Sequence, residues 1–374
     1  MHTTDVVVIG GGAIGTSIAW RAAQRGLRVA LVEREPGRGA SWAAAGMLAP
    51  ITEVHYGEEE VQVLGAESLK LYPAFVAELE SATGRDVGYR ECGTLIVAKD
   101  ADDHAALSEL RGFQDRLGLT VQALKRKEAR ALEPSLTPQL RAAWFVEGDH
   151  QIDNRALTDA LHEAAKRAGV EMIGDSVVEV EVTSDRATGV RLEGGSSVAC
   201  ENVVVAAGCW SASINGIPDE FRPPVRPVKG QLLYLRGLGD PPLIGHNVRG
   251  REVYLVPRTD GRVVVGATVE ERGFDVTVTA GAVYDLLRDA GDIVPGIGEL
   301  ELIECVAGLR PGSPDNRPII GYTGLDGLIA ATGHYRNGIL LTPLTAESVA
   351  EMLTTGDEPE VTAVASPRRF RRAA

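Results

Sequence analysis

The amino-acid sequence predicts an α/β protein in which two domains are interleaved along the chain. A strand, a glycine-rich turn, a helix and a second strand follow one another over residues 5–33, which is the order of a parallel nucleotide-binding sheet. A continuous apolar run at 203–207, closed by Gly208, predicts a further buried strand of that sheet. Between residues 223 and 304, strand-like runs separated by turn residues instead predict a large antiparallel sheet.

Because these patterns alternate, neither domain is predicted to be one continuous stretch. We expect a Rossmann-like nucleotide-binding domain at residues 1–84, 149–219 and 305–374, and a substrate domain of the α+β type at residues 85–148 and 220–304. The segments that predict helices lie at 14–25, 58–83, 101–117, 153–168 and from 339 onward.

The glycine-rich turn is the strongest functional signal. Gly10 permits a tight turn out of the first strand, Gly12 lets the backbone approach a pyrophosphate, and Gly15 lets the helix pack on the strand. The phosphates would then lie at the helix N-terminus. Glu33 ends the second strand, where its carboxylate can bind the adenosine ribose and would repel the extra phosphate of NADP. A glycine-rich turn without a ligand is the alternative, and the motif alone leaves NAD and FAD open.

The composition excludes several classes of protein. The net charge of −14 would repel nucleic acid and anionic membrane surfaces. The four cysteines show neither C-x-x-C nor Cys/His ligand spacing, so we expect no metal site and no disulfide framework. No apolar run is long enough to span a bilayer, and no signal peptide precedes the first strand. We therefore expect a soluble, cytoplasmic protein.

Five motifs spread along the chain together carry a family resemblance. They are GGGAIG at 10–15, SWAAAGML at 41–48, PVKGQ at 227–231, AGLRPG at 307–312 and GHYRNGIL at 333–340. With them the sequence resembles the D-amino acid oxidase family of flavoproteins, and within it the glycine oxidase branch, over nearly its whole length.

The resemblance implies FAD as the cofactor, with its pyrophosphate at the first helix and its flavin between the two domains. A related sarcosine oxidase branch attaches the flavin to a cysteine near the position of Gly308, where a glycine cannot form the bond, so FAD is expected to be noncovalent. That branch also uses a lysine in the strand matching 262–265, which has none here. The cofactor-binding residues implied by the resemblance are Gly10, Gly12, Ala13, Ile14, Gly15, Glu33, Arg34, Ala40, Ser41, Ala45, Gly46, Met47, Val177, Gly208, His334, Tyr335, Arg336, Asn337, Gly338, Ile339 and Leu340.

The last of these segments also has a physical reason to meet the flavin. Reduced flavin carries negative charge near N1 and C2=O, and we expect a helix to begin at this point of the chain. The free N–H groups of Asn337, Gly338 and Ile339 could then stabilise that charge. A helix entry without a ligand is the alternative.

Two arginines are the candidates for substrate binding. A planar guanidinium can bind a carboxylate through two parallel hydrogen bonds, which fixes the Cα of an amino acid. By resemblance, Arg310 binds the substrate carboxylate, Arg336 is a second substrate-contacting arginine, and the hydroxyl of Tyr254 assists. A structural salt bridge is the alternative for either arginine, and a place in the sheet core for the tyrosine. Met47 and Val269 would be walls of the same pocket, Val269 replacing a methionine of the family pattern.

The resemblance implies flavin-dependent oxidative deamination of glycine, sarcosine or small D-amino acids. The neutral amine would give a hydride to FAD, O2 would be reduced to H2O2, and the imine would supply the thiazole half of thiamine. The expected partners are this small amino acid, O2 and further copies of the chain in a homo-tetramer. The alternatives are a D-amino acid dehydrogenase with another electron acceptor, an NAD-dependent dehydrogenase and a non-enzymatic FAD-binding protein.

Overall fold

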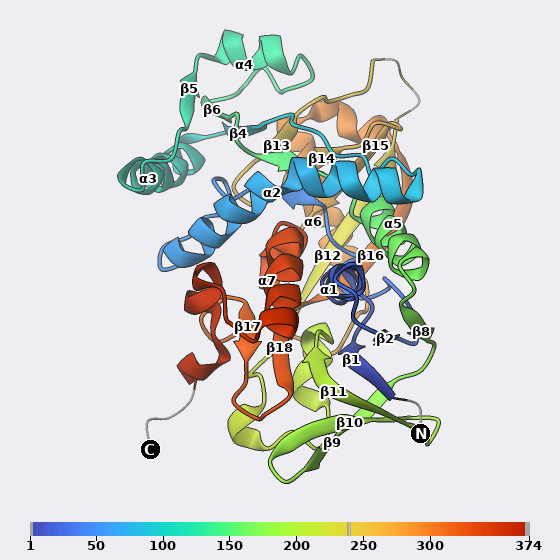
Figure 1. Cartoon of the computed structure of the whole chain (residues 1–374). Coiled ribbons are helices and arrows are strands. Elements are labelled where there is room, and N and C mark those ends of the chain that lie inside the picture. Colours follow the sequence, from blue (N-terminus) through green and yellow to red (C-terminus); the bar gives the residue numbers. More distant parts are fainter. Residues whose placement is uncertain (1–2, 238, 240, 371–374) are drawn as a thin grey trace.

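The computed structural model describes residues 3–237, 239 and 241–370. Its first sheet has the strand order β17-β18-β11-β1-β2-β8, and the hairpin of β9 and β10 continues from β11 (Figure 1). The central strands are parallel, whereas β17 pairs antiparallel with β18 at one edge. Its strands are β1 Thr3–Ile9, β2 Val29–Val32, β8 Glu171–Ile173, β9 Val177–Thr183, β10 Arg186–Leu192, β11 Ser197–Val205, β17 Ile319–Tyr322 and β18 Leu328–Thr332.

Four helices cover one face of this sheet. Trp20, Tyr72, Leu161 and Val349, one from each helix, are buried in a common core with the strand residues Val8 and Leu31. The opposite face packs against the β9–β10 hairpin through Val180 and Val190. The helices are α1 Ala13–Gln24, α2 Glu59–Thr83, α5 Asn154–Arg167 and α7 Thr342–Thr355.

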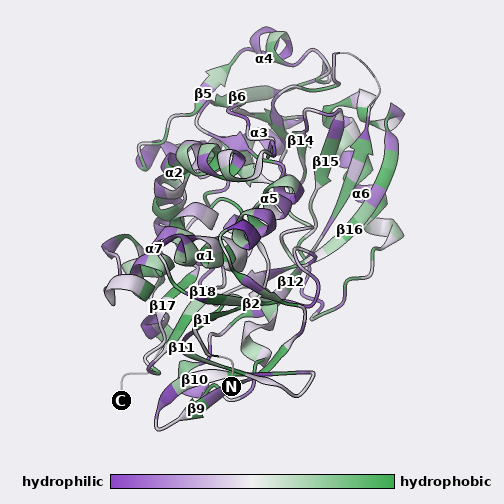
Figure 2. Cartoon of the chain, turned by 45° about the vertical axis from the view of Figure 1, so that its right-hand side comes forward, coloured by the Kyte–Doolittle hydropathy of each residue, from purple (hydrophilic) through white to green (hydrophobic). Residues whose placement is uncertain are grey.

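The second sheet has the order β16-β12-β15-β14-β13-β4-β6-β5, and its pairs are antiparallel except for β13 with β4. Helix α6 packs on one face through Leu286 and Ile293, and the other face looks toward the segment around Ala45. In Figure 2 β15, in the middle of this sheet, is mostly green, and most of its residues are buried. The elements are β4 Thr94–Ala98, β5 Gln122–Leu124, β6 Ala142–Val146, β12 Arg226–Arg236, β13 Asn247–Arg249, β14 Tyr254–Pro257, β15 Arg262–Gly266, β16 Glu301–Gly312, α3 Ala101–Arg116, α4 Arg126–Leu132 and α6 Ala280–Ile293.

The predicted α/β fold with interleaved sheets is confirmed. Strands of the first sheet come from residues 3–32, 171–205 and 319–332, and strands of the second sheet lie in the two stretches between them. The predicted domain boundary between residues 304 and 305 falls inside β16, which pairs with β12 along its length. The domain limits themselves stay a prediction. A small antiparallel pair, β3 Met47–Leu48 with β7 His150–Gln151, connects the two parts.

The last helix begins later than the sequence predicts. Residues Tyr335–Asn337 form a short 3-10 helix, η4, and α7 starts only at Thr342. Pro343 lies in the first turn of α7, where its fixed φ and missing N–H are tolerated, and this sets the start of the helix.

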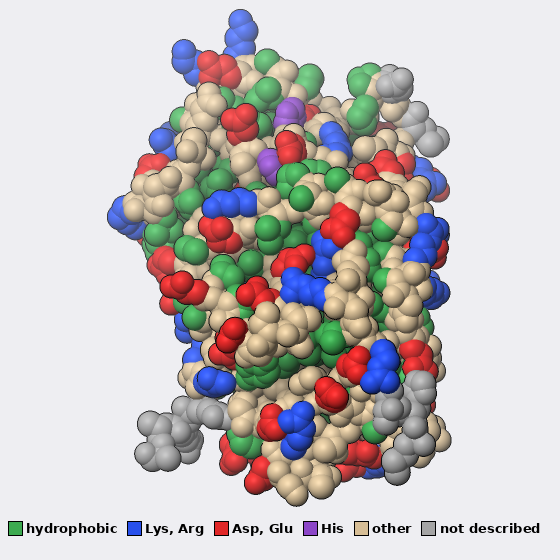
Figure 3. Space-filling model, viewed as in Figure 1, with side chains coloured by type: hydrophobic (Ala, Val, Ile, Leu, Met, Phe, Trp, Pro, Cys, Tyr) green, Lys and Arg blue, Asp and Glu red, His purple; other side chains and the backbone are tan. Residues whose placement is uncertain are grey.

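Acidic and basic side chains are interspersed on the face shown in Figure 3, so the net charge is not gathered there into one acidic area. No helix within the described residues has the length and apolar character to cross a membrane.

Candidate functional site

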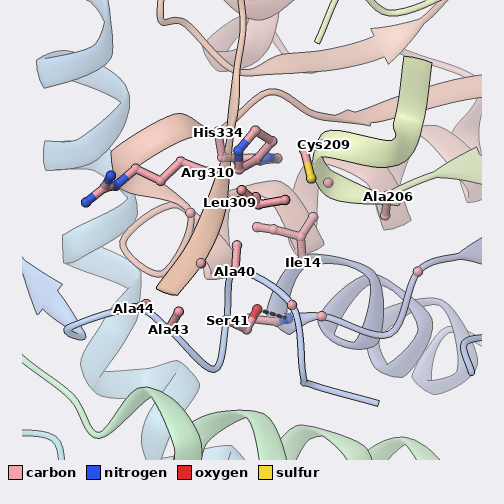
Figure 4. A pocket seen from close by; sticks show the side chains of 18 of the residues that line it. Ile14, Ala40, Ser41, Ala43, Ala44, Ala206, Cys209, Leu309, Arg310 and His334 are labelled. Carbon is pink, nitrogen blue, oxygen red and sulfur yellow. Dashed lines mark hydrogen bonds between the residues drawn. The ribbon is translucent and has the colours of Figure 1, made fainter. Parts of the chain in front are cut away.

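An elongated cavity of about 660 Å³ lies between the two sheets. Ile9 and Val32 at the ends of β1 and β2, Ala206 after β11 and Thr332 at the end of β18 border it, so the cavity opens at the carboxyl ends of the parallel strands. This is the edge at which α/β sheets bind ligands. In Figure 4 the N-terminal residues Ala40 and Ser41 lie on one side of this cavity. Arg310 and His334, from the C-terminal part of the chain, lie on another side.

The glycines of the first turn have the geometry that their motif predicts. Gly10 adopts φ 106°, and a Cβ there would lie 2.5 Å from the carbonyl oxygen of Ala206. A Cβ on Gly15 would overlap the carbonyl oxygen of Gly10, so α1 can pack this close only without a side chain. The turn therefore brings bare backbone to the cavity wall at Gly12.

The start of α1 offers hydrogen-bond donors to the cavity. The N–H of Ala13 donates to Oγ of Ser41 at 2.9 Å, but those of Gly12 and Ile14 have no acceptor within the described part of the chain. At the end of β2, the carboxylate of Glu33 accepts from the N–H groups of Gly11 and Glu35 at 2.9 and 3.0 Å. Unpaired donors beside an oriented acid fit a pyrophosphate with a ribose next to it.

The segment after β2 is held against the cavity by buried polar contacts. Asn154 donates from Nδ2 to the carbonyl of Ser41 at 2.7 Å, and Arg258, which is 4% exposed, donates to the carbonyl of Ala45 at 2.7 Å. Gly46 adopts φ 70°, and a Cβ there would overlap the carbonyl of Ile152. Arg258 had no local signal in the sequence, because its partners come from other elements.

The C-terminal loop closes the opposite end of the cavity. His334 is buried, its Nε2 lies 3.0 Å from Oγ1 of Thr345, and burial lowers its pKa to about 3, so the ring is neutral. The N–H groups of Ile339 and Leu340 have no acceptor among the residues described, and their carbonyls accept from Tyr72 and Ser68 of α2. These N–H groups are free to bind an electron-rich ring edge.

The expectation for Asn337 is wrong in one respect. Its N–H donates to the carbonyl of His334 at 2.9 Å inside η4 and is not free. The 3-10 turn closes this hydrogen bond before α7 begins, whereas the N–H groups of Gly338 and Ile339 have no acceptor among the residues described.

Arg310 and Tyr254 meet at the end of the cavity next to the second sheet. Nη1 of Arg310 donates to the carbonyls of Thr268 and Lys229 at 3.0 and 3.3 Å, and no described carboxylate lies within 4.0 Å of this guanidinium. The hydroxyl of Tyr254 has no hydrogen-bond partner in the described residues, and burial raises its pKa to about 12. A cation and a neutral hydroxyl donor therefore face the same space as Met47.

Arg336 borders the cavity but is engaged by acids. Its Nη2 is paired with Glu58, and its Nε lies 3.5 Å from Oε2 of Glu53. Burial disfavours the charge on Glu53, yet Arg249 and Arg336 hold its pKa below the usual range. The structural salt bridge weighed for Arg336 is thus present.

The structure brings most predicted site residues together. Of the predicted cofactor-binding residues, only Gly15 and Leu340 do not line the cavity. Val269, predicted as a wall of the substrate pocket, does not line the cavity either. Its side chain is 62% exposed to solvent. Sequence reasoning missed the cavity-lining residues Glu53, Arg38 and Trp210, of which Glu53 follows the 41–48 motif closely enough to have been suspected. The described residues include no cluster of acidic, histidine or cysteine side chains that could hold a metal.

A family model described as "FAD dependent oxidoreductase" matches residues 5–352. The chain belongs to this family. The unpaired donors at α1, the bare glycine turn and the donor loop at 338–340 fit FAD along the cavity, and FAD is the family's cofactor.

Relatives within the FAD dependent oxidoreductase family agree with the fold and narrow the comparison. The glycine oxidase of Geobacillus kaustophilus is 36% identical over 94% of this chain and 93% of its own length. The crystal structure of that glycine oxidase superposes on this chain with a TM-score of 0.91, and the match covers 100% of each chain. The hydrogen cyanide synthase subunit HcnC of Pseudomonas aeruginosa is 31% identical over 92% of this chain and 91% of its own. The bifunctional protein ThiO/ThiG of a Synechocystis strain is 35% identical, and this chain spans 54% of its length.

Proposed function

We propose that the protein oxidises glycine and other small amines that carry one carboxylate, with noncovalent FAD as cofactor and O2 as electron acceptor. FAD, when bound, accepts a hydride from the carbon next to the amine and passes both electrons to O2, which gives H2O2. The amine loses two electrons and two protons overall and becomes an imine. The relatives that are named glycine oxidase and ThiO/ThiG support this choice of substrate.

The observation that carries the proposal is the guanidinium of Arg310, which borders the cavity without a carboxylate partner among the described residues. Its fork can hold a substrate carboxylate, and the hydroxyl of Tyr254 can donate to the same group. This fixes the Cα of the amine in the cavity.

One part of the cavity wall is made of small residues. Ala43, Ala44, Ala45 and Gly46 line the cavity, and a Cβ on Gly308 would overlap that of Ala43. We infer from this packing that bulky D-amino acids are poor substrates. The same absence of a side chain at Gly308 supports noncovalent FAD, because no thiol is present there to bind the ring.

Two further assignments rest on the family resemblance. We propose that the imine product supplies the thiazole half of thiamine, and that the chain assembles as a homo-tetramer. A D-amino acid dehydrogenase with an acceptor other than oxygen is the second candidate function, and a non-enzymatic flavin protein is the third.

One experiment separates these functions. The purified protein is mixed without oxygen with glycine, sarcosine, D-alanine or D-phenylalanine, and air is then admitted. We expect glycine and sarcosine to bleach the flavin faster than D-phenylalanine does, and air to restore the colour with one H2O2 per substrate oxidised. Bleaching that air does not reverse would favour the dehydrogenase. No bleaching by any amine would reject an amine oxidase.

A further inference from the structure

Two arginines border the same cavity but differ in their charge partners. Among the residues described, no carboxylate lies within 4.0 Å of Arg310. Arg336 is instead paired through Nη2 with Glu58, and its Nε lies 3.5 Å from Oε2 of Glu53. One guanidinium is open to a substrate carboxylate, while the other is occupied by carboxylates of the chain itself.

The two acids are themselves fixed. Asn316 donates from Nδ2 to Oε1 of Glu58 at 2.8 Å, and Arg249 pairs with Oε1 of Glu53. The side chains of Glu58 and Glu53 are only 9% and 12% exposed. A shift of Arg336 toward the cavity would leave these buried charges short of a partner, which is costly.

The charges of this cluster cancel. Arg249 and Arg336 contribute two positive charges, and Glu53 and Glu58 two negative ones. Arg310 lies outside the cluster, and no carboxylate of the described residues offsets its positive charge. A second carboxylate on a substrate would therefore meet a neutralised Arg336 and the nearby carboxylate of Glu53, which itself lines the cavity.

We propose that Glu53 and Glu58 are specificity-determining residues, which hold Arg336 away from substrate and so restrict the cavity to amines with a single carboxylate. The inference rests on the proposed function in assigning Arg310 as the carboxylate anchor. Discrimination by charge is thus built into the cavity wall, and neutralising one of the two acids releases it.

A binding measurement tests this without turnover. Malonate and malonamate have nearly the same shape, but malonate carries a second carboxylate where malonamate has an amide. Their Kd values are measured from the change that each causes in the flavin absorbance of the FAD-loaded protein. In wild type we expect malonamate to bind more tightly. In Glu58→Gln, Nη2 of Arg336 no longer has a carboxylate partner and can bind the second carboxylate of malonate. We therefore expect the malonate Kd to fall by about tenfold to a hundredfold relative to that of malonamate.

Two further variants serve as controls, and a third is a second test of the same contact. Glu58→Asp keeps the charge and should keep the wild-type preference. Glu60→Gln removes the same charge two residues away, in the first turn of α2, but Glu60 pairs with Arg317 and not with Arg336, so this variant should keep the wild-type preference. Glu53→Gln reaches Arg336 from the other side and replaces Glu58→Gln if that variant folds poorly, as judged by its FAD content and Tm.

The same comparison is made in turnover with iminodiacetate and its monoamide. We expect Glu58→Gln to raise kcat/KM for iminodiacetate relative to the monoamide, chiefly through KM. An unchanged malonate-to-malonamate ratio in both Glu58→Gln and Glu53→Gln would overturn the inference, as would wild-type protein that binds neither ligand. If instead these ratios change as expected but no amine reduces the wild-type flavin, the proposed oxidase function fails and the charge selection stands.

Discussion

Gly230 lies directly under the guanidinium of Arg310. The two residues belong to the paired strands β12 and β16, and a Cβ on Gly230 would lie 2.5 Å from Cζ of Arg310. Arg310 therefore crosses its neighbouring strand over a position with no side chain and reaches the carbonyl of Thr268 at 3.0 Å. The missing Cβ sets where the carboxylate anchor can rest.

Gly230→Ala should consequently damage activity more than folding. The clash falls on the end of a long side chain that can swing aside, so we expect a small change in Tm and near-normal FAD content. The displaced guanidinium should lower kcat/KM for glycine by about tenfold to a hundredfold, as a misplacement near 1 Å does. Gly281→Ala on α6, where a Cβ would meet open space, is the matched control. Wild-type kinetics in Gly230→Ala would show that the resting position of Arg310 is unimportant.

Arg310→Ala should remove the anchor itself. A substrate carboxylate left unpaired in a desolvated cavity costs roughly 3–5 kcal/mol. This corresponds to roughly two to three and a half decades in kcat/KM. Arg310→Lys should recover only part of the loss, since a point charge cannot reproduce the fork. The measurement is kcat/KM for glycine beside the ratio of flavin to protein. A loss of FAD in step with activity would instead give Arg310 a structural role.

The nucleotide end of the site was predictable because its signals are local. Gly10, Gly12 and Glu33 belong to one βαβ unit, in which spacing alone determines the geometry. The resemblance likewise placed Arg310 and Tyr254 at the cavity, and the structure brings them together there. The ion pair of Arg336 and Glu58, by contrast, joins residues 278 positions apart, and no sequence spacing reports such a contact.

Val269 shows a second limit of sequence reasoning. The hydroxyl of the preceding residue, Thr268, accepts from the N–H of Gln231 on the neighbouring strand β12 at 2.9 Å. Side chains alternate along extended backbone, and that of Val269 points to solvent. Aligning Val269 with a pocket residue of the family cannot reveal which face of the sheet its side chain takes, because a shift of one residue moves a side chain to the opposite face.

Denaturation of the protein should release the FAD chemically unchanged. The groups assigned to hold it are the backbone donors at α1 and 338–340 and the acid Glu33, and Gly308 has no side chain that could bond to a flavin. Heat or acid precipitation should release yellow FAD into the supernatant, where chromatography against authentic FAD identifies it. Colour that stays in the washed pellet would contradict noncovalent binding.

The pH dependence of flavin reduction should come from the substrate and not from Tyr254. Burial raises the pKa of this tyrosine to about 12, so its hydroxyl stays protonated and can donate to the carboxylate throughout the range from about pH 6 to pH 10. The pKa of His334, lowered to about 3 by burial, leaves that ring neutral over the same range. Only the neutral amine can give up a hydride, so the anaerobic reduction rate should rise with pH toward the pKa of the substrate amine.

Tyr254→Phe tests this assignment. The variant loses one hydrogen bond to a charged group, and we expect kcat/KM for glycine to fall by about tenfold to a hundredfold. The shape of its pH profile should match that of wild type, because the group that titrates is still present on the substrate. Tyr284→Phe, at an exposed position on α6, is the control and should change neither level nor shape. Stopped-flow reduction without oxygen gives both quantities, and a profile that becomes flat in Tyr254→Phe would assign the titration to the tyrosine instead.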